Sequence, residues 1–394
     1  MTQLIASLFT FALTAAAARA LSIHDFGLFS LAFAIFSLVQ GCIKGLLTEP
    51  IIYSYQTAKR ETAIPSVYAS TGVTLALGAT FSIVGLLLLS SVGDGQWVSW
   101  LLIAMPALVT AGHLRYMAQL MEREWVALIA ECVALSVLIT GMFVVEMTSL
   151  THVAVLWSSS VCVSAIIGLV GLRLLNPLRL FTGWSQGYFK NGLLYVGDFM
   201  ATNSLTHGSV LIVGAIGGPT MAGAIRAAQI LLTPLLVVTR GLMSALGPAM
   251  NRVSARGDMT RVRRISVGYS AAAVSGAVVT VLLVFVVDLA FSAPLLGEST
   301  DGAMAVFPFA VLSTCALGIA GGAALGLRAV SWIRQAFILK LVTLPIGLIA
   351  LFLGAIVAGA PGAQAGLASS EGVRAILNWR MLSRSPAGGR AIEG

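Results

Sequence analysis

Apolar residues occur along this chain in long unbroken runs, separated by short polar segments. A helix needs about 20 apolar residues to cross roughly 30 Å of hydrocarbon, and these runs have that length. The runs are continuous rather than alternating, which favours helices over the strands of a membrane barrel. We therefore predict an all-α membrane protein with twelve spans, at residues 3–21, 28–50, 67–91, 98–118, 126–147, 153–172, 191–216, 221–248, 266–292, 302–327, 337–358 and 360–381.

The composition agrees with an integral membrane protein. Hydrophobic residues make up 58% of the chain and charged residues only 10%, whereas roughly 25% of a soluble domain is charged. A soluble chain of 394 residues would need polar surfaces for two or three domains, and this sequence lacks the residues to supply them. The four cysteines lie inside apolar runs without CxxC spacing, so we expect neither a disulfide framework nor a metal site, and no cofactor.

Basic residues are distributed unequally between the loops. The loops after odd-numbered spans hold no Lys or Arg. The loops after even-numbered spans and the C-terminal tail contain Lys59, Arg60, Arg115, Arg123, Arg173, Arg179, Lys190, Arg252, Arg256, Arg261, Arg263, Arg264, Arg328, Arg334, Arg380, Arg384 and Arg390. This bias predicts that both termini are cytoplasmic. It also explains the net charge of +8 by basic residues in cytoplasmic loops, without a nucleic-acid-binding surface.

An internal repeat relates the two halves of the chain. Spans 2 and 8 each begin beside a glycine, Gly27 or Gly223, and each ends at a proline, Pro50 or Pro248. The offset corresponds to six spans, so the halves share an orientation, one of the repeat schemes that transporters use. We predict two parallel six-helix bundles around a central cavity: residues 1–172, an interfacial cytoplasmic connector at 173–190, and residues 191–394 with a short basic tail.

One span carries a stripe of small residues. The segment "GIAGGAALG" places Gly318, Gly322 and Gly326 four residues apart. Glycines at this spacing let a neighbouring helix approach closely, so we predict tight helix packing here rather than a phosphate-binding loop.

Charged side chains inside apolar spans are costly and are therefore functional candidates. Six of them lie near span ends and are interpreted as reaching the interface: Arg19, Glu49, Glu146, Arg240, Asp288 and Glu371. The cavity-lining candidates are Lys44, Arg226 and Lys340, together with Gln40 and Gln229, which share a helix face with Lys44 and Arg226. Burial of the same residues in structural pairs is the alternative.

Span 7 contains the most polar stretch of any span, "YVGDFMATNSLTHGSV". Its Asp198 and His207 are candidates for coupling a proton or another cation to transport. For His207, a satisfied interior histidine is the competing interpretation.

The segment "ARALSIHDFGLFSLAFAIFSLVQGCIKGLLTEPIIYSY" resembles the start of the polysaccharide-biosynthesis membrane proteins, the O-antigen or exopolysaccharide flippase family. The residues that carry the resemblance are Leu21, Ser22, Asp25, Phe26 and Gly27. The resemblance implies the fold of the multidrug, oligosaccharidyl-lipid and polysaccharide exporter superfamily, and it supplies no catalytic signature.

Three functions compete. The first is a flippase for a lipid-linked oligosaccharide. The cavity candidates include three basic residues and one acidic residue, and this balance suits a diphosphate-bearing substrate because Lys and Arg pair with phosphate oxygens. A drug or cation antiporter of the same superfamily is the alternative. A membrane enzyme is disfavoured, because the outer loops are shorter than functional loops usually are. The expected partners are a lipid-linked sugar, membrane lipids, and a polysaccharide polymerase with its assembly proteins, in the bacterial inner membrane.

Overall fold

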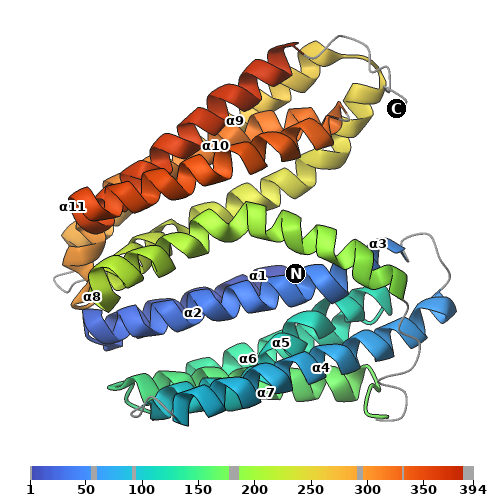
Figure 1. Ribbon diagram of the computed structural model, residues 1–394, viewed down its shortest axis with the longest axis vertical. Coiled ribbons are helices and arrows are strands. Elements are labelled where there is room, and N and C mark those ends of the chain that lie inside the picture. The colour runs from blue at the N-terminus through green and yellow to red at the C-terminus, as the bar shows by residue number, and fades with distance from the viewer. Residues whose placement is uncertain are drawn as a thin grey trace. The chain divides into compact units, whose positions relative to one another are not determined.

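The computed structural model describes residues 2–54, 60–90, 95–176, 186–290, 296–330 and 332–384, apart from the side chains at 53–54, 60–63, 186–191, 240, 244, 288–290 and 333. No strand occurs within these ranges, and Figure 1 shows the helices. The helices are α1 (Thr2–Ala20), α2 (Ile23–Ile43), η1 (Lys44–Thr48), α3 (Glu49–Ser54), α4 (Arg60–Ser90), α5 (Gln96–Leu120), α6 (Glu124–Val144), α7 (Leu150–Gly171), α8 (Gln186–Ala255), α9 (Met259–Ala290), α10 (Ser299–Ala329) and α11 (Ile333–Arg384).

Ten helical segments among the described residues are long and apolar enough to cross a membrane. Two of them are too long for one crossing. The 64-residue segment in α8 would measure about 96 Å as a straight helix, against roughly 30 Å of hydrocarbon. The backbone leaves helical geometry at Gly218 in α8 and at Ala358 and Gly359 in α11. Each helix therefore holds two spans, and the twelve-span prediction is confirmed, with both breaks at the expected boundaries.

By its contacts the chain divides into two compact units. Unit 1 contains Met1–Leu21 and Ala32–Asn203, and unit 2 contains Ser22–Leu31 and Ser204–Gly394. Helix α2 thus contributes its first part to unit 2 and the rest to unit 1, and α8 is divided in the same way. The predicted connector lies partly outside the described residues, and α8 already begins at Gln186, before the predicted start of span 7.

The two units repeat the same packing plan. In unit 1, α5 packs against both α4 and α7, while in unit 2 α10 packs against both α9 and α11 (Figure 1). The start of the third span is tied to the end of the sixth in unit 1, where the Tyr68 hydroxyl donates to the Arg173 carbonyl at 2.6 Å. In unit 2, Arg263 at the start of the ninth span donates to the Ser383 carbonyl at 2.8 Å, at the end of the twelfth.

The motif behind the family resemblance has a structural explanation. The Ser22 side chain accepts a hydrogen bond from the Asp25 backbone N–H at 3.1 Å and so caps the start of α2. Phe26 is fully buried. A Cβ atom added to Gly27 would lie 1.8 Å from the Pro219 carbonyl oxygen, so this position requires glycine. The motif therefore encodes a helix start and a close helix crossing.

The glycine stripe of α10 packs as predicted. Added Cβ atoms at Gly318, Gly322 and Gly326 would each come within 2.7 Å of an atom of α9. These contacts are with Ala273, Ser270 and Ser266. The glycines therefore allow α9 and α10 to approach closely, as expected for small residues at helix interfaces in membranes.

Candidate functional site

A π-helical turn interrupts the second span at Lys44–Thr48. The Glu49 backbone N–H donates to the Lys44 carbonyl, five residues back, which is the bond that defines this geometry. Pro50 follows at once, and a proline has no N–H to continue the α-helical pattern. Helical turns of this wider kind occur frequently at functional sites.

Lys44 lies at the start of this turn and has two partners. Its Nζ atom lies 3.5 Å from Glu49 Oε1 and 4.6 Å from the centre of the Tyr116 ring. Glu49, which the sequence interpretation places near the interface, thus has Lys44 as its partner near the end of the second span. Gln40, one turn earlier, donates to the Leu108 carbonyl at 3.5 Å. Both candidates thus make structural contacts within unit 1.

His113 forms a buried hydrogen-bond network that the sequence interpretation missed. Its side chain is 3% exposed. The ring nitrogen Nδ1 lies 2.9 Å from the Thr48 hydroxyl, in the π turn, and Nε2 lies 3.1 Å from the Ser70 hydroxyl, in α4. The only signal in the sequence is one polar ring inside the apolar run of the fourth span, which does not reveal its partners.

Both ring nitrogen atoms of His113 have a hydroxyl partner. In a neutral imidazole one nitrogen donates and the other accepts, and a hydroxyl can take either role. Thr48 and Ser70 can therefore satisfy both nitrogen atoms of the neutral ring.

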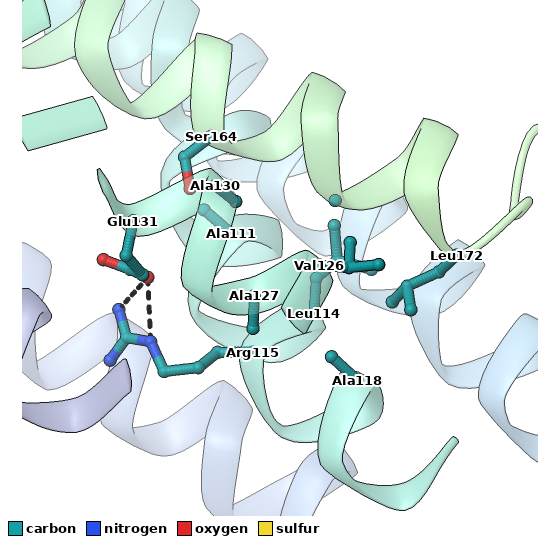
Figure 2. Close-up of a pocket in the computed structure, with 11 residues that line it drawn as sticks. Ala111, Leu114, Arg115, Ala118, Val126, Ala127, Ala130, Glu131, Ser164 and Leu172 are labelled. Atoms are coloured by element: carbon teal, nitrogen blue, oxygen red, sulfur yellow. Dashed lines mark hydrogen bonds and ion pairs between the residues drawn. The ribbon is translucent and has the colours of Figure 1, made fainter. Parts of the chain in front are cut away.

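A second charge pair in unit 1, which is buried, joins α5 to α6. Arg115 donates from Nε at 2.8 Å and from Nη2 at 2.6 Å, both to Glu131 Oε1 (Figure 2). The two side chains are 19% and 8% exposed. They line a narrow cavity, with room for about one water molecule, that Ser164 of α7 also lines. The prediction that Arg115 belongs to a cytoplasmic loop is wrong, since the helix continues to Leu120 and the guanidinium turns inward.

In unit 2, the Arg226 candidate lies in the second half of α8. Its Nη1 atom donates to Gln229 Oε1 at 3.4 Å, and Gln229 Nε2 donates to the Ser209 hydroxyl at 3.5 Å. Arg226 and Gln229 therefore share a helix face, as predicted, and Gln229 links the two halves of α8. Both side chains are partly buried.

Lys340 belongs to a charged cluster inside α11. Arg374 forms an ion pair with Glu371, and the charge of Lys340 also acts on Glu371. The side chains of Arg374 and Glu371 are only 14% and 7% exposed. The interpretation of Glu371 as an interfacial residue is therefore wrong. Within the described spans of unit 2, Arg226 and Lys340 therefore lie in apolar segments in addition to the Arg374–Glu371 ion pair.

The two ion-coupling candidates do not form one site on α8. Asp198 is exposed, whereas His207 is partly buried. Nine residues separate them, and at 3.6 residues per turn this spacing places them on opposite faces of the helix. No group of three or more His, Cys, Asp or Glu residues that could hold a metal ion occurs within the described ranges.

Comparison with known proteins identifies the fold. No family model matches the sequence, and no curated protein matches it. An inward-facing multidrug resistance MATE family transporter of the MOP superfamily is similar in structure, with a TM-score of 0.75 and 14% identity over 96% of this chain and 93% of that chain. The eukaryotic MATE transporter AtDTX14 aligns at a TM-score of 0.57 with 14% identity, covering 98% of this chain and 97% of its own.

A MOP superfamily transporter from Pyrococcus furiosus is a third structural relative, for which a reversed polarity of the binding pocket suggests a different function. Its TM-score is 0.58 at 12% identity, with coverage of 97% of this chain and 92% of that chain. At this level of identity the comparisons establish the fold, and this chain has the fold of the MOP superfamily transporters.

Proposed function

We propose that this protein is a secondary transporter that works by alternating access and exports an amphiphilic organic molecule. Two observations support the proposal together. The transporter fold extends over nearly the whole chain. Both units also keep charged side chains inside apolar spans, at Lys44, Glu131, Arg226 and Glu371, where insertion costs about 2.5 to 3.5 kcal/mol for residues such as Arg, Lys or Asp.

Drug or cation antiport is the first candidate activity, because the similar solved structures include multidrug transporters. The sequence contains no P-loop, so ATP hydrolysed by this chain is not the energy source. An ion gradient is the energy source that we propose. The protein is proposed to lie in the bacterial inner membrane with both termini in the cytoplasm.

The first experiment tests antiport in a bacterial strain that lacks its own drug exporters. Expression of the protein should lower ethidium accumulation, and a protonophore should abolish the difference. The matched control carries Arg380→Gln at an exposed position and should export like the wild-type protein, with membrane levels confirmed by immunoblot. Equal accumulation with and without the protein, across several cationic and anionic dyes, would reject drug export.

Flipping of a lipid-linked oligosaccharide is the second candidate, and the charge of unit 2 favours it. Among the described residues there, Arg226 and Lys340 add to the Arg374–Glu371 ion pair, and an excess of Lys and Arg suits the phosphate oxygens of a polyprenyl diphosphate. A sugar polymerase and its assembly proteins would then act on the product. The reversed pocket polarity of the Pyrococcus furiosus relative is a precedent for different pocket charges on this fold.

The second experiment separates this candidate from the first. In the native host, Arg226→Gln and Lys340→Gln should reduce surface polysaccharide while leaving membrane levels unchanged. Arg380→Gln is the matched control, because Arg380 is exposed on the same helix as Lys340. A normal amount of surface polysaccharide in both variants would show that these cations are not needed for export. A normal amount after deletion of the gene would reject flipping itself.

A further inference from the structure

Exposed arginines gather at one end of unit 2, on the side predicted to be cytoplasmic. Among the described residues of this end, one exposed carboxylate, Asp258, accompanies Arg252, Arg256, Arg261, Arg264, Arg328, Arg334, Arg380 and Arg384. At the corresponding end of unit 1, the described exposed charges are Glu122, Glu124 and Arg173. The positive-inside bias acts on both units alike, so it accounts for the side but not for the excess in unit 2.

The start of α9 presents two of these arginines on one outward face. Val262 is fully buried in a core that includes residues of α10. Arg263 donates to the Ser383 carbonyl at the end of α11, at 2.8 Å. These two contacts fix the rotation of α9. Arg261 and Arg264 are exposed, and because they lie three residues apart they are neighbours on the helix surface.

The same face of α9 continues as an exposed apolar stripe. Val267, Val278 and Leu282 are each more than half exposed. They follow Arg264 by 3, 14 and 18 residues, which places them on its side of the helix at 3.6 residues per turn. An extended exposed apolar surface on a membrane span faces hydrocarbon. The two arginines at its end therefore lie at the level of the lipid headgroups.

This arrangement fits a lipid with a negative headgroup. Guanidinium groups form strong charge-assisted hydrogen bonds with phosphate oxygens. The one nearby carboxylate, Asp258, already accepts the Arg261 backbone N–H at 2.9 Å as a helix cap. We propose that the start of α9 binds the headgroup phosphate of an anionic phospholipid, with Arg261 and Arg264 as its ligands and the acyl chains along the apolar stripe. The site concerns the surrounding membrane, so it holds for either candidate substrate.

The experiment measures lipid binding to the purified full-length protein in detergent by native mass spectrometry. Dioleoyl phosphatidylglycerol is the probe, and dioleoyl phosphatidylcholine, which has no net charge, is the comparison. The double variant Arg261→Gln, Arg264→Gln should lose about 30-fold in phosphatidylglycerol affinity, and each single variant about fivefold, as expected for basic residues beside anionic headgroups. Equal affinity of the wild-type protein for the two lipids, or unchanged affinity in the double variant, would overturn the proposal.

A matched control separates this site from general attraction to a basic surface. Arg252→Gln with Arg256→Gln removes two exposed charges from the same end of unit 2, on α8 and the turn after it. This control should keep the wild-type affinity, and an equal loss would overturn the site on α9. Arg261→Lys with Arg264→Lys keeps both charges and should retain the preference for phosphatidylglycerol.

A further arm tests the contribution of the apolar stripe. Glycerol 3-phosphate, which carries the phosphate without acyl chains, should not displace phosphatidylglycerol at equal concentration. Displacement would mean that the arginines bind any small phosphate, against the proposal of a lipid site. Size-exclusion chromatography confirms that every variant is folded before lipid is added.

Discussion

At the scale of single residues, the interior charges of unit 1 are held in pairs. The Arg115–Glu131 pair is buried between α5 and α6, and both hydrogen bonds converge on one carboxylate oxygen. Removal of one partner leaves the other charge buried without compensation, which costs about 3 to 5 kcal/mol in proteins. The pair thus holds two helices of the bundle together and sets the charge beside the small cavity of Figure 2.

We predict that Glu131→Gln and Arg115→Gln each lower the thermal stability of the detergent-solubilised protein. The exchanged double variant, with Arg115→Glu and Glu131→Arg, should recover most of the loss because it restores the pair in the opposite direction. The melting temperature is measured by heating samples and using size-exclusion chromatography to determine how much folded protein remains. Single variants as stable as wild type would mean that the pair makes no net contribution.

The sequence located several of the interior charges, though not Arg115, and it did not reveal all of their partners. Lys44, Arg226 and Lys340 stand out because each interrupts an apolar run, a property of the local sequence. The partner of Arg115, by contrast, lies 16 residues away on another helix, and only tertiary packing brings it close. His113 was missed for the same reason, since Thr48 and Ser70 come from two other helical segments.

At the scale of helices, two glycines of the internal repeat meet at one crossing. A Cβ atom added to Gly223 would lie 2.7 Å from the Ile23 carbonyl oxygen and 3.2 Å from the Gly27 Cα atom. Gly27 in turn approaches the backbone of Pro219. The repeated glycine that the sequence revealed therefore serves a crossing of α2 with α8, where backbone atoms leave no space for a side chain.

We predict that Gly27→Ala and Gly223→Ala strongly reduce the yield of folded protein, because backbone atoms at the crossing would have to separate. Gly208→Ala in α8 is the matched control, since no atom lies within 4 Å of a Cβ atom at that position. Fluorescence-detected size-exclusion chromatography of tagged variants measures the folded fraction. Equal yields for all three variants would contradict the close crossing.

At the scale of the whole molecule, the repeat extends to the cores of the two units. In unit 1, one core gathers Ile51, Val67, Leu114 and Leu172, from the ends or starts of spans 2, 3, 4 and 6. In unit 2, two neighbouring clusters contain the counterparts Met250, Val262, Leu325 and Leu382, from spans 8, 9, 10 and 12. Hydropathy predicted the spans and their order, because span length and order are local properties. The exchange of the first part of α2 into unit 2 was not predictable, because it depends on packing between distant segments.

The charge distribution of the loops predicts the orientation of this plan in the membrane. Reporter fusions after residues 58 and 258 should be cytoplasmic, and a fusion after residue 95 should be periplasmic. Each position is fused to alkaline phosphatase, which is active in the periplasm, and separately to green fluorescent protein, which fluoresces in the cytoplasm. An opposite result at any of these three positions would break the parallel arrangement of the repeats.

The most direct test of the central claim, gradient-driven transport, uses the purified protein in proteoliposomes. An acidic lumen is imposed, and movement of ethidium and of a fluorescent polyprenyl-diphosphate sugar is recorded in parallel vesicles. The account predicts that at least one of the two moves faster than in protein-free vesicles without ATP, and that a protonophore removes this increase. Movement of both at the protein-free rate, with correctly folded protein present, would contradict it.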